Sequence, residues 1–91
     1  MSVREHVQEA SQEDRVVVGT KETLKHVDEL EEVVIASNTP DGIVADVEEA
    51  AETNDVDVEV FDGSNADLGS LCGRPFAATT IGIREASTTT L

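Results

Sequence analysis

The side chains that could do covalent chemistry are few: one cysteine, Cys72, and two histidines, His6 and His26. A cysteine nucleophile needs a base beside it, and neither histidine stands in a motif that would place it there. The three residues also lack the spacing of a zinc site. No Gly-rich phosphate-binding loop of the Walker or dinucleotide type is present. The sequence predicts a binding protein with no catalytic residues, no metal site, no cofactor and no small-molecule substrate.

Gly19–Lys25 is the stretch best suited to form a binding surface. A glycine after the apolar run Val16–Val18, followed by a hydroxyl residue and a helical pattern, indicates a turn from strand into helix. The start of such a helix exposes amide donors that attract anions. Lys21 and Lys25 lie four residues apart and share one helix face, with Glu22 beside them. This helix start could offer donors and an acceptor to one partner, although a solvated helix N-terminus is the alternative reading of the stretch alone.

The net charge restricts the choice of partner. Twenty acidic and six basic residues give −14 in a chain of 91, and the acids are spread along its whole length. Such a charge would repel nucleic acid at ordinary ionic strength. Two explanations compete: a cationic partner, or a protein that works in molar salt, where the screening length falls to about 3 Å. Acids spread over helix faces and few lysines favour the second, so we expect a halophile's protein.

Size and composition indicate one cytoplasmic domain over residues 1–91. The length suits a single core, and 38% apolar residues suffice to build it. No apolar run approaches the roughly 18 residues of a membrane span, and the first residues lack the apolar centre of a signal peptide. A single cysteine cannot form an internal disulfide, which agrees with a reducing compartment. We expect no membrane partner, and a tail of about 85–91 without clear order.

Hydrophobic periodicity predicts helices that alternate with short strands. The expected helices cover residues 2–11, 21–32, 43–53 and 66–73. The expected strands cover residues 15–18, 33–36, 56–61 and 77–83. Thr20 is the expected N-cap of the second helix. This order implies an α/β fold, a three-layer α/β/α sandwich, in which the loop regions 19–25, 37–42 and 62–76 share one end of the sheet.

Three segments in this order resemble motifs of one family. They are Gly19–Lys25, Val34–Pro40 and Phe61–Phe76. Together they are similar to the kink-turn-binding ribosomal proteins, and within that family to its thirty-e members from archaeal and eukaryotic large ribosomal subunits. The similarity runs from about Val3 to Ile83, nearly the whole chain. It implies the sandwich already inferred, with a mixed four-stranded sheet, and a structural role without catalysis.

The resemblance also implies a set of RNA-binding residues, because members of this family grip a sharply bent internal loop of RNA flanked by sheared G·A pairs. The expected set is Gly19, Thr20, Lys21, Glu22, Lys25, Asn38, Leu68, Gly69, Leu71, Arg74, Phe76 and Ala78. Gly19 and Thr20 would bring backbone close to the RNA, and Lys25 would lie near phosphate. Lys21 would donate to a guanine edge or a phosphate, while Glu22 would accept from guanine's amine donors. Asn38 would hydrogen-bond in the same loop.

The apolar members of the set, Leu68, Leu71, Phe76 and Ala78, would contact an unstacked base. Such contacts suit RNA, whose specific sites are bases displaced from the helix and recognised by their edges and by stacking. The implied partners are ribosomal RNA of the large subunit and neighbouring ribosomal proteins. Residues 41–46 carry no basic residue where thirty-e relatives carry a basic patch. Affinity would then depend on hydrogen bonds and stacking more than on counterion release.

Two alternatives stay open at this point. Within the family, the protein could bind a kink-turn in another RNA, such as that of a guide-RNA particle. Outside it, the acidic composition is compatible with a protein-interaction module that binds no RNA.

Overall fold

Helices and strands alternate through residues 3–85, the part of the chain that the computed structural model describes. In chain order the elements are α1 (Val3–Gln12), β1 (Val16–Val18), α2 (Thr20–Lys25), the 3-10 helix η1 (Val27–Glu29), β2 (Leu30–Ala36), α3 (Asp41–Thr53), β3 (Asp57–Phe61), α4 (Asn65–Leu71) and β4 (Thr80–Arg84). Apart from Glu85, the predicted tail lies outside the described residues. None of the helices in residues 3–85 is long and apolar enough to cross a membrane.

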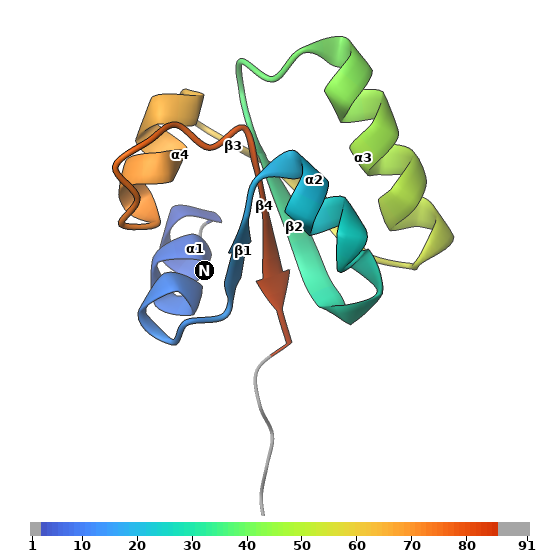
Figure 1. Ribbon diagram of the computed structural model, residues 1–91, viewed down its shortest axis with the longest axis horizontal. Coiled ribbons are helices and arrows are strands. Elements are labelled where there is room, and N and C mark those ends of the chain that lie inside the picture. Colours follow the sequence, from blue (N-terminus) through green and yellow to red (C-terminus); the bar gives the residue numbers. More distant parts are fainter. Residues whose placement is uncertain (1–2, 86–91) are drawn as a thin grey trace, which may run out of the picture.

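The strands form one mixed sheet in the order β1-β4-β2-β3. Strands β1 and β2 are antiparallel to β4, and β2 and β3 are parallel to each other. Because β1, β2 and β3 run in the same direction, their carboxyl ends meet the start of β4 at one end of the sheet (Figure 1). The predicted α/β fold with a mixed four-stranded sheet is confirmed.

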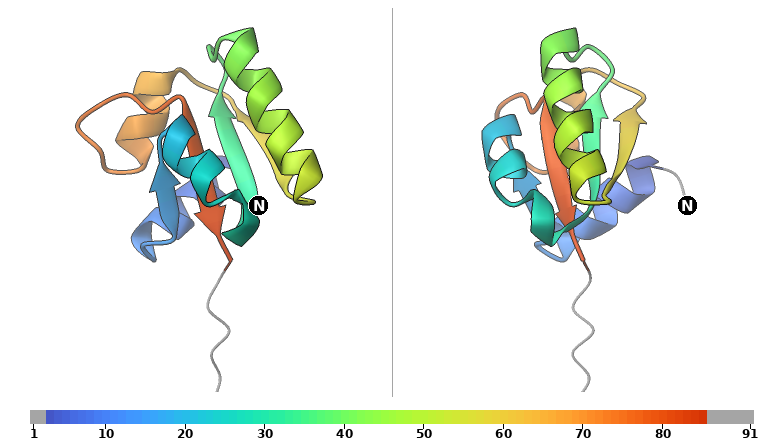
Figure 2. Two further views of the ribbon diagram at one scale, coloured as in Figure 1. Left: turned by 45° about the vertical axis from the view of Figure 1, so that its right-hand side comes forward. Right: turned by 90° about the vertical axis from the view of Figure 1, so that its right-hand side faces the viewer.

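Helices cover both faces of this sheet, as a three-layer sandwich requires. Figures 1 and 2 show α1 and α4 on one face and α2 and α3 on the other. Side chains alternate across a strand, so Val34 of β2 shares a core cluster with Leu68 of α4, while its neighbour Val33 shares one with Val47 of α3. The uninterrupted apolar run of β2 is explained by burial on both faces.

The second helix is shorter than the spacing of its apolar residues predicted. Helix α2 ends at Lys25, the 3-10 helix η1 follows, and β2 already begins at Leu30. The predicted helix over residues 21–32 is therefore wrong beyond Lys25. Val27 and Leu30 are buried as expected, but Leu30 points inward from a strand that pairs with β4, at the position opposite Arg84. A spacing of three residues fits both a helix and a short helix followed by a strand.

The predicted N-cap of α2 is also wrong. Gly19 precedes the helix with φ 108°, and no side chain caps the helix start. The hydroxyl of Thr20 instead donates to the hydroxyl of Thr80 at 2.9 Å. A contact between distant parts of the chain has replaced the local cap that Thr20 could have made.

Candidate nucleic-acid interface

Three loops and the start of α2 meet where the strands β1, β2 and β3 end and β4 begins. They comprise Gly19–Thr20, Ser37–Pro40, Asp62–Ser64 and Gly73–Thr79, and we call them together the loop end. The sequence predicted that three of these regions share one end of the sheet, and the strand directions confirm it (Figure 1).

Neutral hydrogen bonds hold these loops to one another. The backbone N–H of Ser37 donates to the carbonyl of Gly63 at 3.0 Å, and the Ser37 hydroxyl donates to the same oxygen at 2.8 Å. The N–H of Ala36 donates to the carbonyl of Thr79, and the N–H of Gly19 donates to that of Thr80, both at 2.9 Å. Two of the loops are thus bonded to each other, and Gly19 and Thr79 are bonded to the strands β4 and β2, without the use of charged side chains.

A pair of asparagines makes the most specific of these connections. The amide nitrogen of Asn38 donates to the side-chain oxygen of Asn65 at 3.3 Å, and the backbone N–H of Asn65 donates to the side-chain oxygen of Asn38 at 3.0 Å. The carbonyl of Asn65 accepts from the N–H of Ala78 at 2.9 Å. Asn38 is exposed, yet both ends of its amide already have partners in the protein. Its contact with RNA stays a prediction, and its observed contact positions the start of α4.

Sequence reasoning missed Asn65, although a local signal marked its neighbourhood. Ser64 caps α4: its hydroxyl accepts from the N–H of Asp67, and the Asp67 carboxylate accepts from the N–H of Ser64, both at 3.3 Å. This capping box is readable as a serine followed three residues later by an acid. It makes Asn65 the first helical residue of α4, but its partner lies 27 positions away in the sequence.

The start of α2 presents backbone and charge together. At Gly19 the φ of 108° lies in the range that side chains rarely adopt, and a Cβ there would meet no atom within 4 Å. Glycine is needed for this backbone conformation, and it leaves the peptide open to a partner. Lys21 and Glu22 follow it, and both are exposed. The Glu22 carboxylate lies 3.8 Å from Nε2 of His26, one turn along the helix.

Only some of the six basic side chains are without an acidic partner in residues 3–85. Four exposed basic side chains form no ion pair there: Arg4, which lies over the Phe61 ring, and the three residues Lys21, Lys25 and Arg74. The last three belong to the predicted RNA-binding set. Lys25 stands at the end of α2, about 7.5 Å beyond Thr20 at the helical rise per residue. It is therefore the member of the three that α2 carries away from the loops.

The α4 region has a buried and an exposed part. Leu68 is fully buried and Ala78 is 2% exposed, whereas Phe76 is 58% exposed. A Cβ on Gly69 would collide with the backbone carbonyl of Phe76, so the glycine lets the Gly73–Thr79 loop lie against the helix. In this conformation Leu68 and Ala78 support the loop from inside. A direct contact of either with a base stays a prediction.

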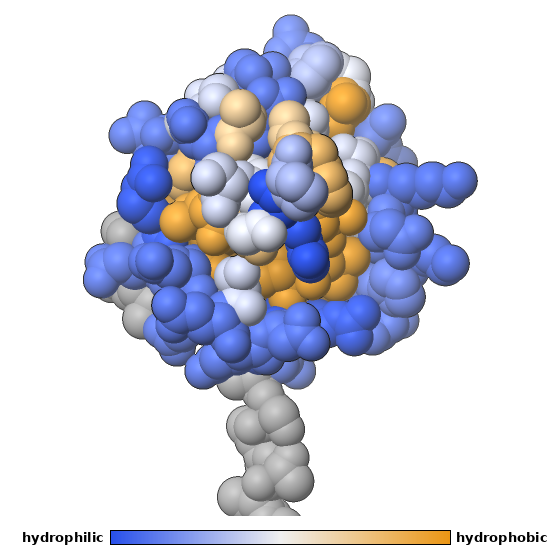
Figure 3. Space-filling view, turned by 60° about the vertical axis from the view of Figure 1, so that its left-hand side comes forward, coloured by the Kyte–Doolittle hydropathy of each residue, from blue (hydrophilic) through white to orange (hydrophobic). Residues whose placement is uncertain are grey.

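The half-buried Leu71 lines a separate hollow with Arg4 and Gln8, so the surface that remains for an apolar contact on this loop lies around the exposed Phe76. A shallow hollow of about 250 Å³ lies here, lined by Ala66, Ser70, Arg74, Pro75, Phe76 and Ala77. Figure 3 shows the side of the molecule that carries α1 and α4, with apolar residues in the middle and hydrophilic residues around them. A flat ring beside a cation is a combination on which an unstacked base can lie.

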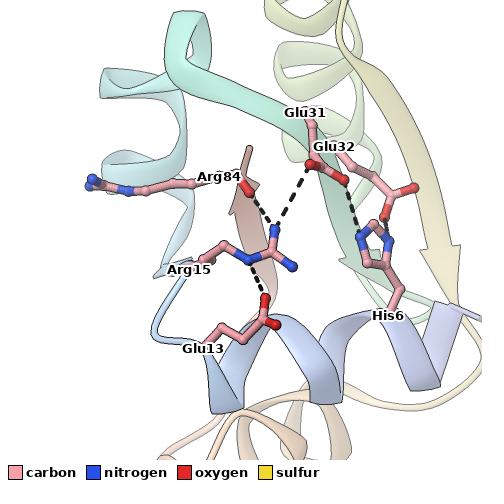
Figure 4. A network of polar contacts seen from close by, with 6 residues as sticks. All are labelled: His6, Glu13, Arg15, Glu31, Glu32 and Arg84. Carbon is pink, nitrogen blue, oxygen red and sulfur yellow. Dashed lines mark hydrogen bonds and ion pairs between the residues drawn. The ribbon is translucent and has the colours of Figure 1, made fainter. Parts of the chain in front are cut away.

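The cysteine and the histidines form no reactive site. Burial raises the pKa of the Cys72 thiol, although nearby Arg74 lowers it, and the neutral thiol is favoured. His6 lies between Glu31 and Glu32, with its ring nitrogens 3.2 and 2.9 Å from their carboxylate oxygens (Figure 4). Within residues 3–85 no three potential ligands are grouped so that they could hold a metal ion.

Similarity to known proteins decides the family. Residues 1–90 match the Ribosomal protein L7Ae/L30e/S12e/Gadd45 family. The chain belongs to this family. The resemblance inferred from three motifs is thereby confirmed, and so is the expectation that the protein is not an enzyme.

Archaeal relatives cover most of the chain. Large ribosomal subunit protein eL30 of Methanosphaera stadtmanae is 29% identical over 87 residues, which are 93% of this chain and 89% of that protein. Its counterpart from Archaeoglobus fulgidus is 39% identical over 70 residues, 75% of this chain and 77% of that protein.

Solved structures share the fold. The 15.5kD RNA binding protein of Giardia lamblia superposes with a TM-score of 0.82 at 25% identity, covering 93% of this chain and 72% of that one. A protein of unknown function from Bacillus halodurans has a TM-score of 0.81 at 16% identity, covering 91% of this chain and 84% of that one. The second likeness shows the common fold alone.

Proposed function

We propose that this protein is a structural constituent of the large ribosomal subunit and binds a kinked internal loop of ribosomal RNA through the loop end. The archaeal relatives are named as large-subunit proteins, which supports the cellular role. The observation that carries the RNA-binding surface is that Lys21 and Arg74, exposed and without acidic partners, belong to elements that begin or end at the rigid loop end. A ribosomal role also agrees with the reducing compartment inferred from the single cysteine.

In this proposal the loop end recognises RNA by shape and by base edges. The open peptide at Gly19 and Thr20 lies against the RNA backbone, while Lys21 donates to a guanine edge or to phosphate. Glu22 accepts from the amine donors of a guanine in a sheared G·A pair, which is a charge-assisted hydrogen bond. A phosphate could not take the place of the guanine, because it offers no donor. Phe76 and Leu71 pack on an unstacked base, and Arg74 and Lys25 lie near phosphates.

Binding at high salt follows from the small number of available cations. The three basic side chains of the proposed RNA surface, Lys21, Lys25 and Arg74, would give a slope of log affinity against log salt of about −2 to −3. We propose that the net charge of −14 is an adaptation to molar salt, in which this shallow dependence preserves RNA binding. Titration of a kink-turn RNA from low to molar KCl measures the slope. A value of about −6 or steeper would contradict the proposal.

Sedimentation of ribosomal subunits in molar KCl tests the cellular role. The protein is expected to travel with the large subunit, and its absence there would contradict that role. The likeness to the RNA binding protein of Giardia lamblia supports the second candidate, a kink-turn binder of another RNA. Recovery of the protein with a small RNA, and not with ribosomes, would favour that candidate. If the protein is recovered with neither ribosomal RNA nor a small RNA, it is better described as an acidic protein-interaction module.

A further inference from the structure

Strand β3 leaves one of its edges unpaired in the part of the chain that the structure describes. It pairs with β2 on one side and ends the sheet on the other, at the margin seen in the right-hand view of Figure 2. Its register with β2 is unbroken from Asp57 to Phe61, and it contains neither proline nor lysine. An edge strand without these protective features presents outward N–H and C=O groups on which a further strand can form. Strand β1, at the opposite edge, has only three residues.

The chain segment that contains this edge, from the start of α3 to the residue after β3, is acidic and contains no basic residue. From residue 41 to residue 62 the chain contains nine acids and no lysine, arginine or histidine. The acids are Asp41, Asp46, Glu48, Glu49, Glu52, Asp55, Asp57, Glu59 and Asp62. None of them takes part in an ion pair within residues 3–85. Asp57 and Glu59 stand on β3 itself and are exposed, so a strand added here would meet two carboxylates.

An apolar hollow lies at the carboxyl end of the same strand. About 300 Å³ are enclosed by Val3, Arg4, Val60, Phe61 and Asp62. Val60 is 59% exposed, which is unusual for a valine in a sheet. Arg4 has its guanidinium 5.0 Å from the centre of the Phe61 ring. If a further strand pairs with β3, an apolar side chain of that strand can pack against the exposed Val60.

The charges argue against two other occupants of the edge. In a dimer formed by pairing β3 with β3, Asp57 and Glu59 would face other acids, and like charges across strands are destabilising. A nucleic acid would be repelled by the same carboxylates. A cationic polypeptide is attracted by them.

We propose that the outer edge of β3 binds an extended lysine- or arginine-rich segment of another protein by strand addition. Backbone hydrogen bonds hold the segment, its cations face Asp57 and Glu59, and an apolar residue between them packs on Val60. This interaction goes beyond RNA binding and uses no residue of the predicted RNA-binding set. The protein would then contact RNA at the loop end and a basic protein segment along β3.

An alternating Lys/Val peptide of about seven residues, acetylated and amidated, is a suitable probe, since this length matches a typical strand. It is titrated into isotope-labelled protein at the lowest KCl concentration that keeps the protein folded. The amide signals of Asp57–Phe61 are expected to shift, and a peptide N-methylated at alternate residues is expected to bind at least about tenfold more weakly. Equal binding of the methylated peptide, or unchanged β3 signals, would overturn the proposal.

Matched charge reversals separate strand addition from general attraction. One double variant changes the strand, Asp57→Lys/Glu59→Lys. The control changes the exposed surface of α3, Glu48→Lys/Glu49→Lys. Both replace two acids by two lysines and so change the net charge from −14 to −10. Peptide affinity is expected to fall about tenfold in the first and less than about twofold in the second. Equal losses would overturn the proposal. Affinity for a kink-turn RNA, measured on the same proteins, tests the proposed function separately.

Discussion

The two ends of the sheet are stabilised by different kinds of interaction. At the loop end, backbone groups and the amides of Asn38 and Asn65 bond to one another. At the opposite end, carboxylates have side-chain partners: His6 contacts two glutamates, and Arg15 donates to the Glu13 carboxylate as well as to the carbonyl of Arg84, both at 2.7 Å (Figure 4). Some of the few basic side chains of this protein are therefore engaged in its own structure. The basic side chains without such partners determine where an anion can bind.

The difference has a consequence for salt. Salt screens ion pairs, whereas hydrogen bonds between neutral groups depend on it little. The loop end should keep its shape from low to molar salt, while the network around His6 and Arg15 should weaken. Four predictions probe this contrast.

The largest effect is expected from Gly69→Ala. The added methyl group would collide with the carbonyl of Phe76, so either the Gly73–Thr79 loop or α4 must shift. Overpacking of this kind costs about 1–3 kcal/mol of unfolding free energy, and displacement of the loop should also weaken RNA binding. Chemical denaturation and RNA titration measure the two effects. Gly42→Ala is the control, because a Cβ there meets no atom within 4 Å. Equal behaviour of the two variants would show that the loop end is not rigid.

Lys21→Ala and Glu22→Ala should act on binding alone. Each removes a charged group that is exposed at the start of α2. A hydrogen bond to a charged group contributes about 1.5–3 kcal/mol, so each variant should bind RNA about tenfold more weakly or worse, with little change in unfolding. Isothermal titration with a kink-turn RNA gives the affinities, and Glu48→Ala on α3 is the control. If both variants bind like the wild type, the RNA surface lies elsewhere.

Arg15→Ala and Arg84→Ala compare two arginines at the opposite end. The Arg15 side chain is 13% exposed and makes the two short bonds described above, whereas that of Arg84 is 46% exposed and 3.9 Å from Glu29. Loss of the first should cost about 1–3 kcal/mol of unfolding free energy, and loss of the second less than about 1 kcal/mol. Denaturation in low salt measures both. Neither variant should change the affinity for RNA, and a loss there would refute the separation of the two ends.

Glu32→Gln gives the smallest effect and a defined pH trend. Burial raises the pKa of Glu32 above its ordinary value of 4.5, although His6 lowers it in part. A raised pKa means that the folded state favours the protonated carboxyl, so its contribution to stability is complete below pH 4.5 and is lost as the pH rises through the folded pKa. The unfolding free energy of the wild type, relative to Glu32→Gln, should therefore decrease on going from acid to neutral pH.

His6 is in direct contact with the Glu32 carboxylate, so the comparison is best repeated with His6→Gln in both proteins. This change removes an interaction that lowers the pKa of Glu32, and the decrease should become larger. An increase in relative stability toward neutral pH would contradict the assigned cause.

Local patterns predicted most of the architecture, because periodicity is a property of neighbouring residues. The apolar run Val33–Ala36 predicted a strand covered on both faces, and the motifs around Gly19 and Phe76 pointed to the family. Where the apolar spacing fitted both a helix and a strand, strand pairing decided between them. Strand β2 starts at Leu30 because it bonds to β4, and the helix before it ends early.

The sequence by itself determined the order of the elements, their layers, and the end of the sheet at which they meet, since these follow from local preferences and strand direction. Only the tertiary structure decided which polar groups remain available to a partner. Asn38 is occupied by Asn65, Gly69 is required by the carbonyl of Phe76, and Arg15 is bound by Glu13 and Arg84. Two of these contacts, Asn38 with Asn65 and Arg15 with Arg84, join residues far apart in the chain, and no local pattern encodes such a distance.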